Sequence, residues 1–441
     1  MSTAIADAPA ATAGKLRWVM VTMAFLVAAV SYLDRSNISI AAPVLKKDLA
    51  LSDVQLGMVF SAFVFGYALT QPFAGRLADR FGPGRVISVG ILWWSLLTAA
   101  TAMIPSTFAQ AFVLLLIVRC ILGIGESVIF PASNRLVASW IPSRERGLAN
   151  GLIFAGVGVG AGIAPPLITS IMLSSDWRGA FWASALIGIV VLVIWLLLVR
   201  DKPEQHRWTG EAELQLINSD RTVAPAAQQA TLVPWRSIIT NRQVALLTLA
   251  YFCFGYVAYI FFTWFFTYLS EVRGLDLKSS GLYGTLPFIA MAIASPLSGY
   301  VSDKLVKPYG RRVARCAPAA IGMALAAVFV ALATQVADAR LAAAVLALGS
   351  GGLYLSQSAF WTLSADIGRE SAGSVSGLMN MGNQLGGLCV ASITPVIAHS
   401  FGWTGSFMAA AAAAMVGATI WLFIDPSASL TCNDEANGEV R

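Results

Sequence analysis

The sequence predicts an all-α integral membrane protein with about twelve transmembrane helices, arranged as two halves of six. Of the 441 residues, 57% are hydrophobic and only 12% are charged, whereas a soluble globular chain carries about 25% charged residues. Apolar runs of about twenty residues, long enough to cross a bilayer, recur along the whole chain. So few polar side chains cannot cover a water-facing surface, and the surplus apolar surface must face lipid.

The apolar runs divide into two sets of six. Between the sets lies a polar stretch, roughly 200–242, with charged residues, prolines such as Pro225 and Pro234, and a Gln-Gln pair, which is typical of a connecting loop. The expected spans are 18–41, 54–76, 84–104, 108–130, 147–172, 179–199, 243–269, 280–302, 312–334, 339–362, 372–398 and 402–424. The expected divisions are a first half at 1–200, a central loop at 201–242, a second half at 243–425 and a tail at 426–441.

The basic residues indicate how the chain is oriented in the membrane. If the N-terminus is cytoplasmic, 21 of the 29 Lys and Arg residues fall on the cytoplasmic side and only 6 in the outer loops. Cytoplasmic loops carry an excess of these residues, so we expect both termini in the cytoplasm and the chain in a bacterial-type inner membrane. No plausible cleavage site follows the first run, which favours an uncleaved helix over a signal peptide.

The composition excludes several classes of function. The net charge of +6 arises in the loops, so it reflects topology, and no nucleic-acid partner is expected. The five cysteines lack metal-ligand spacing, and His206 and His399 have no nucleophile or metal set around them in the sequence. Neither a metal site nor an enzyme active site is therefore expected. The absence of a Gly-rich phosphate loop gives no support to ATP-driven transport, and no cofactor is expected.

A short motif occurs twice, in the loop after the second helix of each half. The first copy runs Gly75-Arg-Leu-Ala-Asp79-Arg80-Phe-Gly-Pro-Gly-Arg85. The second runs Gly299-Tyr-Val-Ser-Asp303-Lys304, followed by Gly310-Arg311-Arg312. Glycine lets neighbouring helices approach closely, and the aspartate can cap or pair at a helix end. Basic inner loops would explain the arginines alone but not the whole pattern repeated in register.

Four ionisable residues lie inside spans of the first half: Asp34, Arg35, Arg119 and Glu126. Each costs about 2.5–3.5 kcal/mol at the centre of a membrane helix, so they must face one another or a water-filled cavity. Arg119 and Glu126 share a helix face but lie roughly 10 Å apart, too far for a firm ion pair with each other. The adjacent Asp34 and Arg35 differ by about 100° around the helix, so only one can point straight into a central cavity. A static charge network holding the half together is the alternative.

The second half supplies hydrogen-bonding and aromatic groups instead of charge. Its spans contain Tyr251, Tyr256, Tyr259, Trp264, Ser356, Gln357, Ser358, Trp361, Asn380, Asn383 and Gln384. An arginine can clamp a carboxylate or sulfonate, while amides and hydroxyls pair with hydroxyl groups. The division suits an anionic, hydroxylated solute, although many of these rings could equally be packing residues or interface anchors.

The repeated loop motif resembles that of the major facilitator superfamily, and the resemblance covers nearly the full chain. In that family, two six-helix halves rock about a midplane site. The stretch Tyr32-Leu-Asp34-Arg35-Ser-Asn37, with Phe65-Gly66-Tyr67 and Arg119-x6-Glu126, is similar to the anion:cation symporter branch. This branch includes bacterial galactonate, glucarate and hexuronate transporters and animal organic-anion carriers.

The resemblance implies a role for each matching residue. Asp34 and Glu126 would carry protons, Arg35 would clamp the anion, and Arg119 would tune the two acids. Substrate would also contact Tyr32, Tyr67, Ser358, Trp361 and Asn380. The chain departs from the galactonate type at Val157, where that type has Gln, and at Phe360, where it has Thr. These lost polar contacts imply a different or smaller, less hydroxylated anion, so small carboxylates or sulfonates compete with six-carbon sugar acids.

The sequence therefore predicts a proton-coupled transporter that imports a small organic anion by alternating access. Its expected partners are the anion, protons and the lipid bilayer, with the proton gradient as energy source and a monomer as the working unit. The alternative is a drug/proton antiporter of the same fold. The Asp34-Arg35 pair favours an anionic cargo over the lipophilic cations of such efflux proteins.

Overall fold

The computed structural model describes residues 14–106, 110–218, 232–265, 268–427 and 430, and assigns no strand among them. The N-terminal residues 1–13, part of the central loop at 219–231 and most of the expected tail at 426–441 lie outside the described residues. The first half comprises α1 (Leu16–Asp48), α2 (Asp53–Phe81), α3 (Pro83–Ala102), α4 (Ala111–Glu126), α5 (Ile129–Trp140), η1 (Ser143–Glu145), α6 (Arg146–Ser174) and α7 (Trp177–Leu198).

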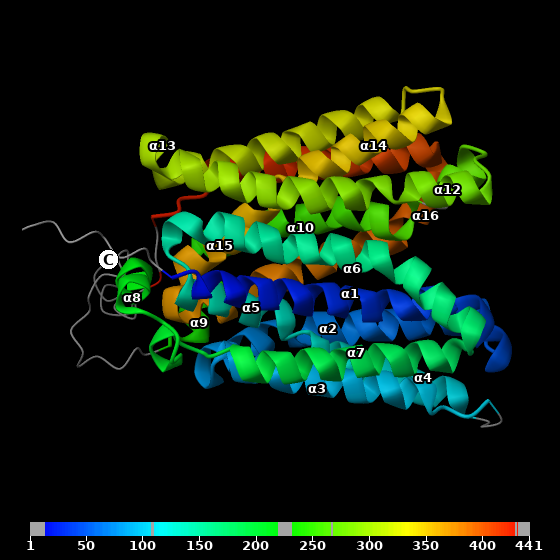
Figure 1. The fold of residues 1–441 in the computed structure, drawn as a ribbon. Helices are drawn as coiled ribbons and strands as arrows, with labels where there is room; N and C mark the ends of the chain where they lie inside the picture. The colour runs from blue at the N-terminus through cyan, green and yellow to red at the C-terminus, as the bar shows by residue number, and fades with distance from the viewer. Residues whose placement is uncertain (1–13, 107–109, 219–231, 266–267, 428–429, 431–441) are drawn as a thin grey trace, which may run out of the picture.

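The second half follows two short helices, α8 (Glu211–Asn218) and α9 (Trp235–Thr240). It comprises α10 (Arg242–Thr263), η3 (Tyr268–Val272), α12 (Leu277–Gly284), α13 (Leu286–Ala333), α14 (Ala339–Tyr354), α15 (Gln357–Gly368) and α16 (Ala372–Ile420). Figure 1 shows α10, α13, α14 and α16 stacked above α1, α2, α3 and α7, with α8 and α9 at one end of the bundle.

The described residues contain ten apolar segments able to cross a membrane, and two of these are long enough to cross twice. Leu282–Ala333 has 52 residues and Ala339–Thr394 has 56, whereas one crossing takes about 20. The first reverses direction at Gly310 (φ 76°), and the second between α15 and α16; α16 itself turns again at Gly402 (φ 70°), beyond the second segment. Such positive φ angles favour glycine. The predicted architecture of twelve spans in two six-helix halves is thereby confirmed.

Several helices extend further than hydropathy predicts, and two of them do so through polar segments that pack between the halves. The expected spans 108–130 and 339–362 end early, because the helices continue through α5 to Trp140 and through α15 to Gly368. Asn134 of α5 donates a hydrogen bond to Ser364 of α15 at 2.9 Å, and both side chains are buried. Polar residues lower the hydropathy of these segments, but they face the other half of the protein and not lipid.

Close backbone contacts join the halves at the end of the bundle that carries α8 and α9. There α2 packs along α16, and α6 packs along α13. A Cβ atom on Gly75 would lie 1.9 Å from the carbonyl oxygen of Gly373, and one on Gly299 would lie 2.1 Å from that of Gly147. Each half thus brings a motif glycine of its second helix against the fifth helix of the other half, and this end is closed.

The motif aspartates hold the same two junctions by hydrogen bonding to helix N-termini. Asp79 accepts from the backbone N–H groups of Gly373 (2.9 Å) and Ser374 (2.7 Å) at the start of α16. Asp303 accepts likewise from Gly147 (3.1 Å) and Leu148 (2.7 Å) at the start of α6. A carboxylate at a helix N-terminus pairs with free N–H groups and with the positive end of the helix dipole.

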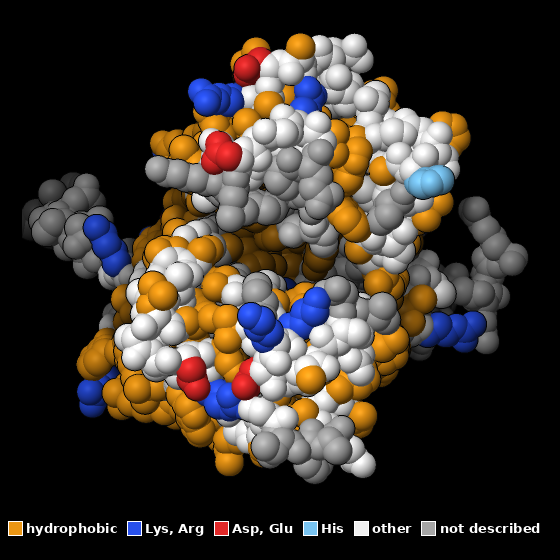
Figure 2. Space-filling model, turned by 90° about the vertical axis from the view of Figure 1, so that its right-hand side faces the viewer, with side chains coloured by type: hydrophobic (Ala, Val, Ile, Leu, Met, Phe, Trp, Pro, Cys, Tyr) orange, Lys and Arg blue, Asp and Glu red, His pale blue; other side chains and the backbone are white. Residues whose placement is uncertain are grey.

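The opposite end of the bundle is open between the halves. Figure 2 views this end and shows a hollow between the upper mass, formed by the second half, and the lower mass, formed by the first. On the predicted orientation, in which the motif loops are cytoplasmic, this is an outward-open arrangement.

We expect Gly75→Ala to weaken the closed junction. The added Cβ would meet the Gly373 carbonyl, and overpacking of this kind costs about 1–3 kcal/mol, which shifts the equilibrium between closed and open junctions by about five- to 150-fold. Hydrogen–deuterium exchange of the amides at 69–81 and 372–380 should therefore become faster. The matched control is Gly57→Ala on the same helix, where nothing lies within 4 Å of the new Cβ; equal exchange in the two variants would contradict the expectation.

Candidate functional site

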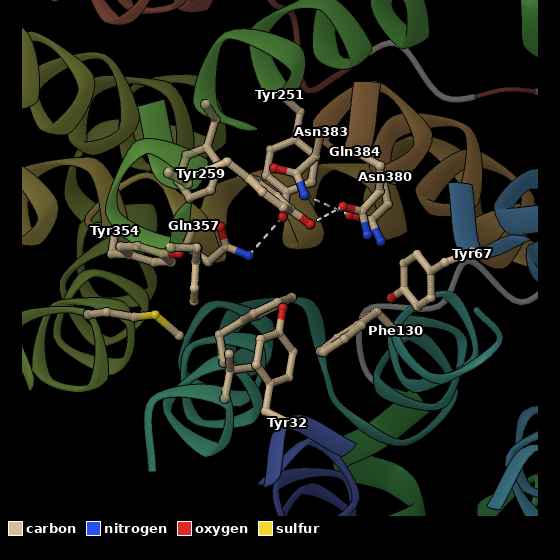
Figure 3. Close-up of a pocket in the computed structure, with 16 residues that line it drawn as sticks. Tyr32, Tyr67, Phe130, Tyr251, Tyr259, Tyr354, Gln357, Asn380, Asn383 and Gln384 are labelled. Carbon is tan, nitrogen blue, oxygen red and sulfur yellow. Dashed lines mark hydrogen bonds between the residues drawn. The ribbon is translucent and has the colours of Figure 1, made fainter. Parts of the chain in front are cut away.

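A cavity lies between the halves, in the middle of the bundle. Figure 3 shows its polar lining from the second half facing Tyr32, Phe130 and Tyr67 of the first half. The second half contributes Tyr251, Tyr259, Tyr354, Gln357, Asn380, Asn383 and Gln384. The lining therefore combines aromatic rings and amides, and no charged side chain is among its residues.

The tyrosines and amides of the second half are linked to one another. Gln357 donates to the hydroxyl of Tyr251 at 2.8 Å, and the hydroxyl of Tyr259 donates to the side-chain oxygen of Gln384. Trp361 also donates its indole N–H to Tyr251, at 2.9 Å. These bonds fix the rings and amides before any solute enters, which lowers the entropy cost of binding.

Two residues expected to touch substrate do not line the cavity. Trp361 is 1% exposed and lies behind Tyr251, to which its N–H is bonded. Ser358 is fully buried, and its hydroxyl has no hydrogen-bond partner among the described residues. Of the expected contacts, Tyr32, Tyr67 and Asn380 do line it. The helix spacing in α15 turns Gln357 toward the cavity in place of Ser358.

An ion pair between Arg35 of α1 and Glu126 of α4 lies beside the cavity. The guanidinium nitrogen of Arg35 is 2.9 Å from the carboxylate of Glu126, whose side chain is only 1% exposed. Ser31, one turn before Arg35, also donates to this carboxylate. The pair satisfies the requirement that charges in a membrane compensate one another, and it gives Glu126 the partner that Arg119 could not provide.

Arg35 is enclosed by aromatic rings as well as by its acid partner. Its guanidinium carbon lies 4.5 Å from the ring centre of Tyr32, 4.9 Å from Phe63 and 4.7 Å from Tyr67. Cation–π contacts of this kind strengthen when they are desolvated. Arg35 is not itself among the lining residues. It lies directly behind Tyr32 and Tyr67, so a cargo anion could reach it only where these rings give access.

Asp34 and Arg119 occupy a second position, away from that pair. Asp34 is 3% exposed and accepts from the hydroxyl of Thr98 on α3, at 3.0 and 2.9 Å to its two oxygens. Arg119 is 2% exposed and lies 4.7 Å from the ring centre of Phe63. Within the described part of the chain, neither has an ion-pair partner within 4 Å. The adjacent Asp34 and Arg35 therefore turn toward different helices.

The basic residues of the repeated motif take separate places. Arg80 stacks on Phe81 (5.3 Å), and Arg85 is 82% exposed and 3.7 Å from Asp201, so neither reaches Asp79. That aspartate faces Arg135 of α5, which also pairs with Glu370. Asp303 pairs with Arg315 at 2.5 Å. Arg135 and Arg315 were not singled out in the sequence, because their partners are brought to them only by folding.

Further residues of the site were missed for a simple reason. Thr98, Ser31 and Phe63 contact the charged groups, yet each is an ordinary residue within an apolar span. Of the two departures from the galactonate type, Val157 lines the cavity, while Phe360 is buried against Tyr251 with ring centres 4.5 Å apart. Only the Val157 departure therefore lies on the cavity wall.

A central cavity between two six-helix halves, closed at one end and open at the other, is the architecture of a membrane solute transporter. The model for the Major Facilitator Superfamily matches residues 24–391, and the chain belongs to this superfamily. The predicted resemblance is confirmed, and the protein is a transporter and not an enzyme.

Named relatives match nearly the whole chain. A protein of Cupriavidus necator named "Probable sulfoacetate transporter SauU" is 35% identical over 436 residues, covering 97% of this chain and 98% of that protein. The "Probable galactarate/D-glucarate transporter GudP" of Bacillus subtilis is 33% identical over 412 residues, covering 90% and 89%. The solved structure of the proton:xylose symporter XylE, with 16% identity, shares the fold at a TM-score of 0.73 over 93% of this chain and 96% of that one.

Removing one partner of the buried ion pair should destabilise the protein. In Glu126→Gln, Arg35 keeps its charge without a carboxylate, and breaking a buried pair in this way costs about 3–5 kcal/mol. We expect a lower thermal unfolding midpoint in detergent, partly restored in the double variant Arg35→Gln/Glu126→Gln. Asp48→Asn is the control, since its pair with Arg178 is 25–33% exposed and is worth about 1 kcal/mol at most. An unchanged midpoint in Glu126→Gln would show that the pair does not hold the half together.

Proposed function

We propose that the protein imports a small organic anion together with protons, and that the Arg35–Glu126 pair beside the cavity carries this function. The guanidinium of Arg35 lies against the cavity-lining Tyr32 and Tyr67, and its ion pair with Glu126 keeps it from binding another anion. A carboxylate that holds an arginine must be neutralised before the arginine can clamp another anion. Protonation of Glu126 would do this, so proton binding and anion binding are linked.

The proposed cycle begins in the outward-open arrangement. Asp34 and Glu126 take up protons, Arg35 is released, and the anion enters between Tyr32, Tyr67 and the amides of the second half. The halves then rock, the closed junctions at Asp79 and Asp303 open, and the protons leave to the cytoplasm. The carboxylate of Glu126 recaptures Arg35 and expels the anion. Arg119 compensates the charge of Asp34 whenever that acid is ionised.

The four intramembrane charges sum to zero when both acids are ionised. With both acids protonated, the site carries two positive charges, which suits a carboxylate, a sulfonate or an anion that has both groups. Relatives named for sulfoacetate and for galactarate or glucarate span this range. The apolar Val157 on the cavity wall favours the smaller, less hydroxylated end of it.

The alternative of drug efflux finds no support among the curated relatives, which are named for sulfoacetate and for galactarate or glucarate. We also propose, from the distribution of basic residues, that the motif loops and both termini are cytoplasmic and that the membrane is a bacterial-type inner membrane. The halves 1–200 and 243–425, joined by the loop 201–242, would be the rocking units, and a single chain would suffice for transport.

Purified protein in liposomes should accumulate the anion when the outside is acidic. Sulfoacetate, galactarate, glucarate and a hexuronate form the test panel. Asp34→Asn should abolish accumulation driven by the pH gradient while exchange of labelled for unlabelled anion continues. The amide imitates the protonated acid but cannot release a proton, so the carrier can exchange anions but cannot return empty. Asp338→Asn, at the start of α14, is the control and should accumulate normally. If uptake by the wild type is the same with and without a pH gradient, proton coupling is refuted.

Thr98→Val should change the pH profile of uptake. The variant removes a hydroxyl that hydrogen-bonds Asp34, and such a bond to a charged group is worth about 1.5–3 kcal/mol. The ionised acid is then less favoured, so half-maximal uptake should move upward by about one pH unit or more. Thr101→Val is the matched control, since Thr101 is also buried on α3 but bonds to its own helix at Leu97. Coincident profiles for the two variants would exclude this role for Thr98.

A further inference from the structure

Gln71 is a fully buried polar residue of α2 that bonds to both halves of the protein. Its side-chain nitrogen donates to the backbone carbonyl of Ser127 at 3.2 Å, within the first half. Its side-chain oxygen accepts from the amide nitrogen of Asn380, on α16 of the second half, at 2.8 Å. Ser127 directly follows Glu126, so the chain of bonds starts one residue from the ion pair and ends at the cavity wall.

The backbone carbonyl of Ser127 determines how the side-chain amides of this hydrogen-bonded series are oriented. A backbone carbonyl can only accept, so Gln71 must turn its nitrogen toward it and its oxygen toward Asn380. Asn380 must then turn its nitrogen toward Gln71, which leaves its oxygen toward Asn383 and the cavity. Asn383 donates to that oxygen at 3.4 Å, and Figure 3 shows the oxygen of Asn380 on the side of Tyr259 and Asn383.

The bond between Gln71 and Asn380 also crosses the closed junction. Beside it, a Cβ on Gly377 of α16 would lie 2.5 Å from the backbone carbonyl of Gln71, so the two helices touch here through their backbones. Rocking of the halves must part α2 from α16 at this end and break the bond. Asn380 therefore has a fixed amide only while this end is closed.

We propose that Gln71 is a positioning residue that fixes the Asn380 amide with its oxygen toward the cavity, so that a cargo hydroxyl is recognised only in the outward-open state. This inference rests on the proposed function and adds to it a chemical preference and its dependence on conformation. An oriented acceptor favours an anion that carries a hydrogen-bond donor nearby. When the junction opens, Asn380 turns freely, and the hydroxyl loses its oriented partner as the anion is released.

Two pairs of anions test the preference, each pair differing only in hydroxyl groups: malate with succinate, and galactarate with adipate. Their dissociation constants are measured from ligand-dependent unfolding of the purified full-length chain. The test variant is Gln71→Met, which has a similar volume and no amide. Gln71→Glu is the conservative variant, since its neutral form can make both bonds. Hydrogen–deuterium exchange at 69–81 and 372–380 reports the junction without any ligand.

Asn134→Leu supplies a matched control. Asn134 also bonds across the halves, to Ser364, and both are buried away from the lining residues. Both Gln71→Met and Asn134→Leu should therefore raise exchange at the junction. Only Gln71→Met should lower the preference for the hydroxylated member of a pair, by about three- to tenfold, as expected for one hydrogen bond. Gln71→Glu at acid pH should retain it.

The outcomes separate the inference from the proposed function. A wild type that binds both members of each pair equally, or a Gln71→Met variant with the wild-type ratio, overturns the role of Gln71. Transport of sulfoacetate with no binding of malate or galactarate also overturns it, while leaving proton-coupled anion uptake intact. Loss of pH-driven uptake for every anion in the panel instead refutes the proposed function, and the exchange measurement then still shows whether Gln71 holds the junction.

Discussion

The structure depends on one constraint, which is that a charge held within the membrane must be compensated by another group of the protein. The pairing of Arg35 with Glu126 at 2.9 Å meets it most directly. Around this pair the first half assembles a hydroxyl from Ser31 and three aromatic rings, so α1, α2 and α4 are fixed relative to one another. An arrangement of this kind is stable only while both partners are charged, which makes it a natural place for a proton to act.

The same constraint operates at the closed end, where backbone groups take the place of a cation. Asp79 and Asp303 each hold the N-terminus of a helix from the opposite half, and the motif glycines allow the backbones to meet. The two junctions are equivalent in position within their halves, which explains why the motif occurs twice. These contacts are hydrogen bonds and glycine contacts between separate halves, so in the proposed cycle water can replace the hydrogen bonds when the halves part. A continuous hydrophobic interface would not part so easily.

Both halves contribute side chains to the cavity or to the layer directly behind its wall. In the first half, the charged Arg35 lies behind Tyr32 and Tyr67, while the second half provides hydrogen-bonded tyrosines and amides. Asn380 belongs to the second half, yet its direction is decided by a backbone carbonyl of the first half acting through Gln71. The amide of Asn380 therefore belongs both to the cavity wall and to the contact between the halves. This sharing is the physical requirement for a site whose affinity changes with conformation.

The sequence by itself determined the membrane class, the twelve spans and the identities of the buried charges, because hydrophobicity and the cost of burying charge are properties of the residues. It also showed that Arg119 and Glu126, seven residues apart on one helix, could not pair firmly. Only the tertiary structure decided that Glu126 pairs with Arg35, that Asp303 pairs with Arg315 and that Gln357 rather than Ser358 lines the cavity. It likewise carried α5 and α15 beyond the apolar runs, since their polar residues face each other across the halves. Each of these outcomes depends on how helices are rotated and placed against one another, and such contacts leave no signal in a single chain read one residue after the next.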